Sequence, residues 1–170
     1  MNRKWFTKSA IVLCGVVLFG IVVLPFQPAG NVSDITSVTV SKLTETEANQ
    51  LPRFSDVSPD TCGEKTSEGT PCTIKADQVV QWGWGLCEPN EMSLHFKAAI
   101  AHVELMVDNV RLPDELIYQH DVTIKDRPNP YCHGWMIKLT QWQSGHTVRL
   151  ENRAKLLLPR YGNVFLISVQ

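Results

Sequence analysis

The sequence predicts an all-β sandwich of about seven or eight short strands, preceded by an N-terminal transmembrane or signal helix. Three features support this prediction. Apolar and polar residues alternate in several short runs rich in β-branched and aromatic side chains, and proline and glycine separate these runs. A long apolar segment lies near the start of the chain. Four cysteines follow that segment, and an even number is typical of an exported domain with paired disulfides.

The first nine residues are basic, and the segment after them is apolar. Arg3, Lys4 and Lys8 precede residues 10–26, which carry no charge. This pattern is typical of a signal-anchor or signal-peptide helix. We therefore expect residues 1–9 in the cytoplasm, residues 10–26 in the membrane, and the remainder of the chain outside.

The length of this segment favours a retained anchor over a cleaved signal peptide. A helix over residues 10–26 spans roughly 25 Å, a little less than the hydrocarbon core of about 30 Å. It is also longer than the roughly 7–15 apolar residues of a signal peptide. Cleavage after Ala29 would put Gln27 where a small residue is usual. We expect a single-pass protein of the cell membrane, with secretion after cleavage as the alternative.

The rest of the chain has the size of one domain. Residues 27–34 are expected to form a tether, and residues 35–170 an extracytoplasmic β-sandwich. Residues 31–170 carry 13 basic and 17 acidic side chains, a net charge of −4, which gives no support to a nucleic-acid partner. A solvated strand face explains the basic residues near the C-terminus: Arg149, Arg153, Lys155 and Arg160.

The four cysteines allow three disulfide pairings, of which we favour Cys62 with Cys72 and Cys87 with Cys132. The segment between Cys62 and Cys72 is polar and rich in turn residues, so its ends can meet. Cys87 ends one strand pattern and Cys132 begins another, which suits a tie between strands or between sheets. Loop closure would stabilise the fold by roughly 2.8 kcal/mol for the short loop and roughly 4 kcal/mol for the long one. The spacing does not resemble that of a zinc site.

Strand patterns occur at intervals through the domain. Strands are expected at 37–41, 79–87, 101–107, 110–112, 116–124, 131–140, 146–150 and 164–169, and residues 156–158 are expected to continue an edge. Residues 44–72 are polar and interrupted by proline and glycine, which predicts a long loop. Residues 91–100 are ambiguous because Asn90 can cap a helix, whereas alternation begins at residue 101. We expect a short helical turn or an irregular segment there.

The strand at 79–87 is the most distinctive one. Period-two alternation divides its side chains between two faces, with Val80, Trp82 and Trp84 on one and Gln81, Gly83 and Gly85 on the other. The small face allows another backbone or a ligand to come close.

Three segments carry a resemblance to a known group of proteins: 81–84, 131–135 and 139–148. They resemble uncharacterised bacterial secreted or membrane-anchored proteins with an immunoglobulin-like β-sandwich. The resemblance covers roughly residues 73–152 and implies an immunoglobulin-like fold and an export route, but no catalytic residues. Tyr131 immediately precedes Cys132, whereas antibody domains place a tyrosine two residues before the second cysteine.

No motif in the sequence specifies a reaction. The histidines lack the spacing of a zinc helix, and Gly-x-Ser-x-Gly does not occur. His102, His133 and His146 would have to converge from different strands to bind a metal, and separate histidines are the simpler expectation. The cysteines are expected to be oxidised, so none is a nucleophile. We expect no catalytic residues, no metal site and no cofactor.

Aromatic residues give the best indication of a binding surface. Trp82 and Trp135 are expected to fill the core, as tryptophans on central strands of sandwiches do. Trp142 lies in a predicted turn, so the sequence leaves both an exposed and a buried ring open there. Together with Tyr131 and Trp84 it forms the set of candidate ligand-binding residues, because exposed rings stack on sugars and anchor protein interfaces.

Two functional hypotheses of different classes follow. The first is a non-catalytic binding or adhesion module at the cell surface, whose partner is an unknown surface protein. The second is a carbohydrate-binding domain that uses exposed aromatics to hold a glycan. An envelope enzyme is a third and weaker hypothesis.

Overall fold

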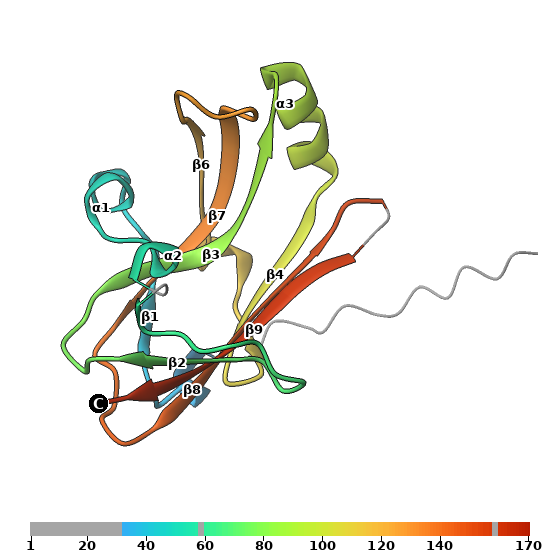
Figure 1. Cartoon of the computed structure of the whole chain (residues 1–170). Coiled ribbons are helices and arrows are strands. Elements are labelled where there is room, and N and C mark those ends of the chain that lie inside the picture. The colour runs from blue at the N-terminus through green and yellow to red at the C-terminus, as the bar shows by residue number, and fades with distance from the viewer. Residues whose placement is uncertain (1–31, 58–59, 158–159) are drawn as a thin grey trace, which may run out of the picture.

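A computed structural model describes residues 32–57, 60–157 and 160–170. The described chain is mostly β-strand and forms two sheets (Figure 1). The strands are β1 (Thr39–Ser41), β2 (Thr70–Ile74), β3 (Val80–Glu88), β4 (His102–Val107), β5 (Val110–Arg111), β6 (Tyr118–Thr123), β7 (Tyr131–Thr140), β8 (Thr147–Lys155) and β9 (Arg160–Val169). The α-helices are α1 (Glu45–Gln50), α2 (Phe54–Val57) and α3 (Glu91–Ile100), and short 3-10 turns form η1 (Val32–Asp34) and η3 (Asp114–Leu116).

The first sheet is built around β7. Strand β3 pairs with one edge of β7, antiparallel, and both β1 and β6 pair with the other edge at opposite ends. The second sheet has the order β2-β9-β8-β4-β5, in which β2 runs parallel to β9 and the remaining pairs are antiparallel. An all-β sandwich is therefore confirmed.

The core lies between the two sheets. Alternation along β3 and β7 buries Trp82, Trp135 and Ile137 on the face that meets the second sheet, and β8 buries Val148 and Leu150. Trp82 is 3 % exposed and Trp135 is 5 % exposed, so the expectation that both tryptophans fill the core is confirmed. The expected hairpin after residue 107 is also present, with Asp108 and Asn109 at positive φ.

The sandwich has two distinct ends. Helix α3 follows β3 and leads into β4, so it stands at the end where β3 finishes and β4 begins (Figure 1). The last residue of β8 and the first residue of β9 lie at that same end, because Lys155 pairs with both His102 and Arg160. We call this the α3 end. At the opposite end, which we call the Asp108 end, Ser37 hydrogen-bonds to the Asp108 carboxylate and its carbonyl accepts from Gln143 N–H.

The loop expected over residues 44–72 contains structure of its own. Thr44 caps α1 with a capping box, in which its hydroxyl accepts from Glu47 N–H and the Glu47 carboxylate accepts from Thr44 N–H. Residues 70–74 form β2, which sequence pattern alone did not predict. The prediction of a loop up to residue 72 is wrong here because pairing with β9 supplies the hydrogen bonds of β2.

Both favoured disulfides are present: Cys62–Cys72 and Cys87–Cys132. The second joins directly opposed residues of β3 and β7 within one sheet. Alternation places this bridge and the core tryptophans of the same strands on opposite faces of the sheet. The bridge therefore ties two strands together rather than two sheets.

Two further interpretations of the sequence do not hold: Trp142 as an exposed binding residue, and residues 156 and 157 as a strand edge. Trp142 is only 3 % exposed, because its ring packs into the core and its indole N–H donates to the Gln78 carbonyl at 2.8 Å. Residues 156 and 157 form a bend rather than a strand, since β8 ends at Lys155 and Leu157 takes a positive φ of 44°. The ambiguous segment at 91–100 is a complete helix capped by Asn90.

The expected cytoplasmic segment 1–9, the anchor 10–26 and residues 27–31 of the tether lie outside the described residues. Within the ranges that are described, no helix combines the length and the hydrophobicity that a membrane crossing requires.

Candidate functional site

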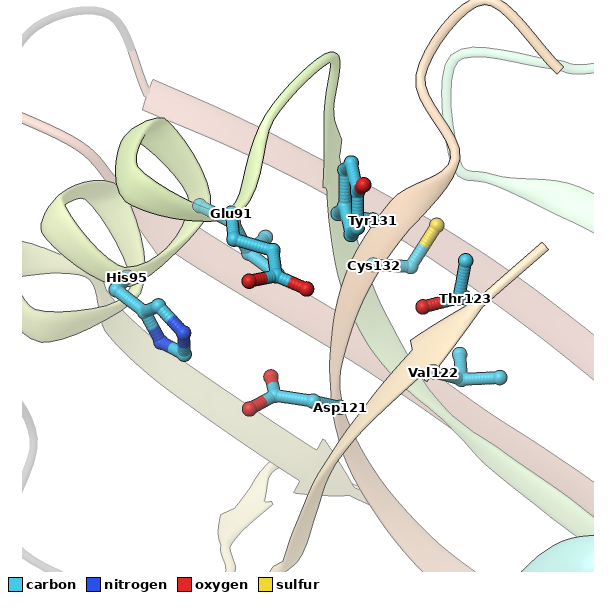
Figure 2. A pocket seen from close by; sticks show the side chains of 8 residues that line it. Glu91, His95, Asp121, Val122, Thr123, Tyr131 and Cys132 are labelled. Carbon is cyan, nitrogen blue, oxygen red and sulfur yellow. The ribbon is translucent and has the colours of Figure 1, made fainter. Parts of the chain in front are cut away.

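The α3 end holds a polar pocket between helix and sheet, with a volume of about 200 Å³. Figure 2 shows the carboxylates of Glu91 and Asp121 and the ring of His95 directed into the same space. Glu91 and His95 lie one helical turn apart on α3, and Asp121 comes from β6. Tyr131 of β7 adds an aromatic wall. The pocket thus offers the carboxylate oxygens of Glu91 and Asp121 as hydrogen-bond acceptors beside the half-buried ring of Tyr131.

Asp121 is paired with a histidine of the neighbouring strand. The Nδ1 atom of His133 lies 2.6 Å from the Asp121 carboxylate, and the two residues face one another in the register of β6 with β7. The imidazole packs against the edge of the Trp135 ring, with 4.3 Å between ring centroids. The buried Nε2 atom of His133 has no hydrogen-bond partner. This pair orients one carboxylate oxygen and leaves the other side of Asp121 open to the pocket.

A second surface at the α3 end is apolar. Five side chains line a depression of about 240 Å³ together with the stem of Lys97: Phe96, Ile100, Leu156, Leu157 and Tyr161. Phe96 is 63 % exposed, Leu157 is 71 % exposed and Tyr161 is 47 % exposed. Helix α3 and the β8–β9 connection each contribute part of this set, which we call the apolar surface. Met92, 82 % exposed, lies one turn before Phe96 on the same helix.

Helix α3 is held in place by contacts to the end of β3. Leu94 is buried, and the largely buried Glu88 carboxylate accepts from Ser93 at 2.8 Å and pairs with Lys97 at 2.6 Å. The Lys97 contact, with the Ser93 hydroxyl next in importance, lowers the pKa of Glu88 below its ordinary value. The apolar surface therefore sits on an anchored helix and not on a free segment.

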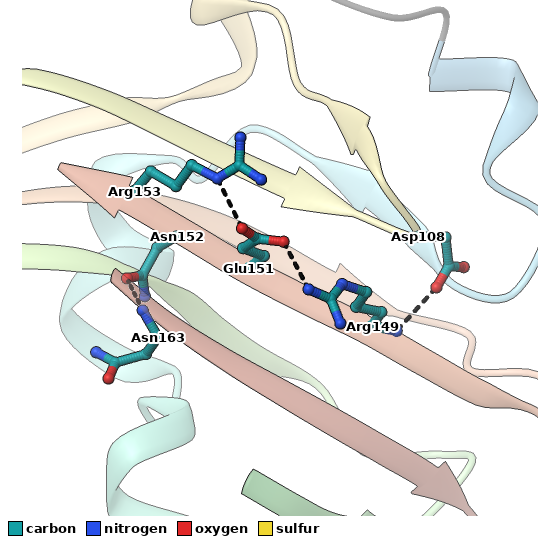
Figure 3. A network of polar contacts seen from close by, with 6 residues as sticks. All are labelled: Asp108, Arg149, Glu151, Asn152, Arg153 and Asn163. Carbon is teal, nitrogen blue, oxygen red and sulfur yellow. Dashed lines mark hydrogen bonds and ion pairs between the residues drawn. The ribbon is translucent and has the colours of Figure 1, made fainter. Parts of the chain in front are cut away.

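Two of the basic residues near the C-terminus, Arg149 and Arg153, share the carboxylate of Glu151. The largely buried Glu151 carboxylate accepts from Arg149 at 2.9 Å and from Arg153 at 2.6 Å, two residues away on either side along β8 (Figure 3). The Asp108 carboxylate accepts from the backbone N–H of Arg149 at 2.8 Å. Glu151 is thus the one acidic partner that the described residues show for the side chains of these two arginines.

The structure does not bring the three candidate aromatics together. Tyr131 lines the polar pocket, and Trp84 is half-buried against Trp135, with 5.3 Å between ring centroids. Trp142 is buried. Sequence patterns did not single out Phe96, Leu157 or the Asp121–His133 pair. The run from Phe96 to Ala101 was alanine-rich and ambiguous, and the pairing of Asp121 with His133 depends on strand register.

Comparisons with known proteins do not add to this description, since no family model, no curated protein and no solved structure matches the chain. Among the described residues no group of three or more histidine, cysteine, aspartate or glutamate side chains is arranged to hold a metal ion. Cys132, which borders the polar pocket, is committed to a disulfide, so it supplies no thiol there.

Proposed function

We propose that this protein is a membrane-anchored, extracytoplasmic binding module that docks a protein partner through the apolar surface at its α3 end. The main support for this proposal is that exposed Phe96, Leu157 and Tyr161 line one depression although they come from separate elements. Single exposed apolar residues are common on soluble proteins, but contiguous ones mark interaction sites. Aromatic anchors beside aliphatic side chains are typical of the energetic centre of an interface.

The backbone at Leu157 supports this proposal. Its φ of 44° is unusual for a residue with a side chain, and such conformations cost about 1–2 kcal/mol. The strained backbone presents a leucine to solvent rather than burying it. Backbone strain that is not offset by burial of the side chain is typical of functional positions.

The position of the apolar surface suits an anchored protein. The described chain begins near the Asp108 end, where Ser37 contacts Asp108, and the apolar surface lies at the α3 end. An anchor at residues 10–26 would attach through the tether to the Asp108 end. The α3 end would then face away from the membrane, where a partner can reach it. The two disulfides fit an oxidising compartment.

We also propose that the sandwich belongs to the immunoglobulin-like class. The two packed sheets support it. The position of Cys87–Cys132 within one sheet differs from the bridge between sheets found in antibody domains.

Carbohydrate binding is the second candidate function. Because Trp142 is buried, we place carbohydrate binding in the polar pocket. Tyr131 offers a ring face there, and the Glu91 and Asp121 carboxylates can accept hydrogen bonds from sugar hydroxyls. Glycan binding that is lost in Tyr131→Ala and retained in His146→Ala would favour this candidate.

Site-specific photo-crosslinking in intact cells tests the first candidate. A photoreactive phenylalanine analogue replaces Phe96, and the same analogue at Gln143, an exposed position at the Asp108 end, serves as the matched control. We expect one discrete protein adduct from position 96 that is absent from position 143. Equal adduct patterns at both positions, or none at position 96, would contradict docking through the apolar surface.

A further inference from the structure

The outer face of the first sheet carries a third pocket, which borders the polar pocket at Val122 and Cys132. It has a volume of about 120 Å³ and lies over the face that alternation directs away from the core. Its lining combines a cationic rim with an apolar floor. Two permanently charged residues, Arg53 and Arg127, and the imidazole of His120 form this rim.

Arg53 is fixed by its backbone, and its guanidinium is left open. Its N–H donates to the Asp56 carboxylate at 3.1 Å, its carbonyl accepts from Asp56 N–H at 2.9 Å, and it bridges to Gln81 of β3. Arg127 lies in the β6–β7 connection and is exposed. Among the described residues neither guanidinium has an acidic partner within ion-pair distance. Two planar, permanently charged donors thus border one small space.

His120 forms the third polar part of the rim. Its ring stacks on Tyr118 and covers Gly134, where an added Cβ would lie 3.2 Å from the His120 ring. The Nδ1 atom is buried and has no hydrogen-bond partner. Burial first, and then the charges of Arg53 and His133, lower the pKa of His120, while Asp121 opposes them. Without an anion in the pocket, the surroundings disfavour the protonated ring.

The floor of the pocket is apolar and lacks side chains at two places. Gly85 and Gly134 face one another across β3 and β7, and an added Cβ at Gly85 would have only the His133 carbonyl nearby, at 3.5 Å. The walls come from Val122, Ile124 and Met136 and from the Cys87–Cys132 bridge. The outer face of the sheet is therefore open to a ligand at Gly85, whereas the His120 ring covers Gly134.

We propose that this pocket binds a small organic carboxylate, with the carboxylate held by Arg53 and Arg127 and its apolar body resting over Gly85, beside the His120 ring. Guanidinium forks match carboxylates in geometry and charge. A fully hydrated inorganic anion would gain nothing from the apolar walls. A neutral apolar molecule would leave the two guanidiniums without a counter-charge.

Isothermal titration of the full chain in a nonionic detergent provides the test, with benzoate, inorganic phosphate and benzyl alcohol as probes. We expect saturable binding of benzoate, at least tenfold weaker binding of phosphate, and no binding of benzyl alcohol. Benzoate should also raise the pKa of His120, followed by NMR of its ring protons, because an anion beside the ring stabilises the imidazolium.

Matched variants localise the binding. Arg53→Gln and Arg127→Gln should each weaken benzoate binding at least fivefold, and the double variant should abolish it. Arg160→Gln, an exposed arginine of β9 outside this pocket, should leave it unchanged. Because neither pocket guanidinium has an ion-pair partner in the described fold, these variants should remain folded. The proposal is overturned if benzoate does not bind, if phosphate or benzyl alcohol binds as well as benzoate, or if the double variant still binds.

Discussion

Asn152 of β8 donates its side-chain amide to the carbonyl oxygen of Gly83 on β3, at 3.3 Å, and so joins the two sheets inside the core. The same side chain accepts from the backbone N–H of Asn163 at 3.2 Å. Asn152 is only 3 % exposed. Gly83 itself is required by close backbone approach, since an added Cβ would lie 1.9 Å from the Trp135 carbonyl oxygen. A buried polar group therefore fixes how the sheets sit on one another.

Replacing Asn152 by alanine should lower the free energy of unfolding by about 1–3 kcal/mol, because it leaves Gly83 O and Asn163 N–H without this partner. Urea denaturation followed by circular dichroism measures the change. Asn163→Ala is the matched control, since its exposed side chain is outside this contact, and it should stay within about 0.5 kcal/mol of the wild type. Equal effects of the two substitutions would contradict the role of Asn152.

Trp142 should behave as a core residue. Trp142→Ala should cost about 3–5 kcal/mol of stability, because it empties a packed site. Trp142→Phe should cost less, since it retains much of the packing and removes the hydrogen bond to the Gln78 carbonyl. Thermal unfolding of both variants checks the order. A Trp142→Ala protein as stable as the wild type would show that the ring lies outside the core.

The two disulfides should contribute unequally. Cys87–Cys132 closes a sequence separation of 45 residues and Cys62–Cys72 one of 10. In the chain-entropy model these loops correspond to about 4 and about 2.8 kcal/mol. The paired alanine variants, compared by urea denaturation, should therefore rank with loss of Cys87–Cys132 as the more destabilising. The reverse order would indicate that strand pairing already constrains the unfolded chain between β3 and β7.

Stability should fall in acid through two carboxylates of lowered pKa. Lys97 and Ser93 lower the pKa of Glu88, and the Lys138 contact with the capping bonds of Thr44 lowers that of Glu47 to about 2. The ordinary pKa of glutamate is 4.5, so the unfolded chain binds these protons before the folded chain does as the pH falls. The stabilisation from the two ionised carboxylates is therefore present above that pH and declines below it.

Glu88→Gln should make this decline shallower. Urea midpoints measured from pH 7 to pH 3 give the comparison, with the exposed Glu64→Gln as control. A Glu88→Gln curve parallel to that of the wild type would contradict a stabilising role for the ionised carboxylate. Hydrogen exchange should also increase in α3, since Glu88 holds Ser93 and Lys97 of that helix.

Several strands and both disulfides followed from local patterns in the sequence. Strand β7 and the 79–87 run show clear alternation, and the Asp108–Asn109 turn has residues that tolerate positive φ. Strand β2 did not follow, because Thr70–Ile74 depends on β9, nearly a hundred residues later, for its hydrogen bonds. Pairing at that distance is not encoded in a local pattern.

The candidate sites were harder to predict for a related reason. Trp142 follows a residue at positive φ, Gln141, and the turn directs the ring inward to a partner at residue 78. Phe96 and Leu157 become neighbours only because Lys155 and His102 pair across the second sheet. Arg53 and Arg127 border the same pocket, where strand register places Gly85 opposite Gly134. Each of these placements is a property of the assembled sandwich.

Binding of a protein partner to the apolar surface can be tested directly. The measurement is the affinity of the full chain for the protein that is crosslinked at position 96. Isothermal titration would compare the wild type with Leu157→Asp and with Gln143→Asp, which adds the same charge at the Asp108 end. A carboxylate at the centre of an apolar contact should weaken binding at least tenfold, equivalent to about 1.4 kcal/mol, while Gln143→Asp leaves it unchanged. Equal affinities for all three proteins would contradict the claim.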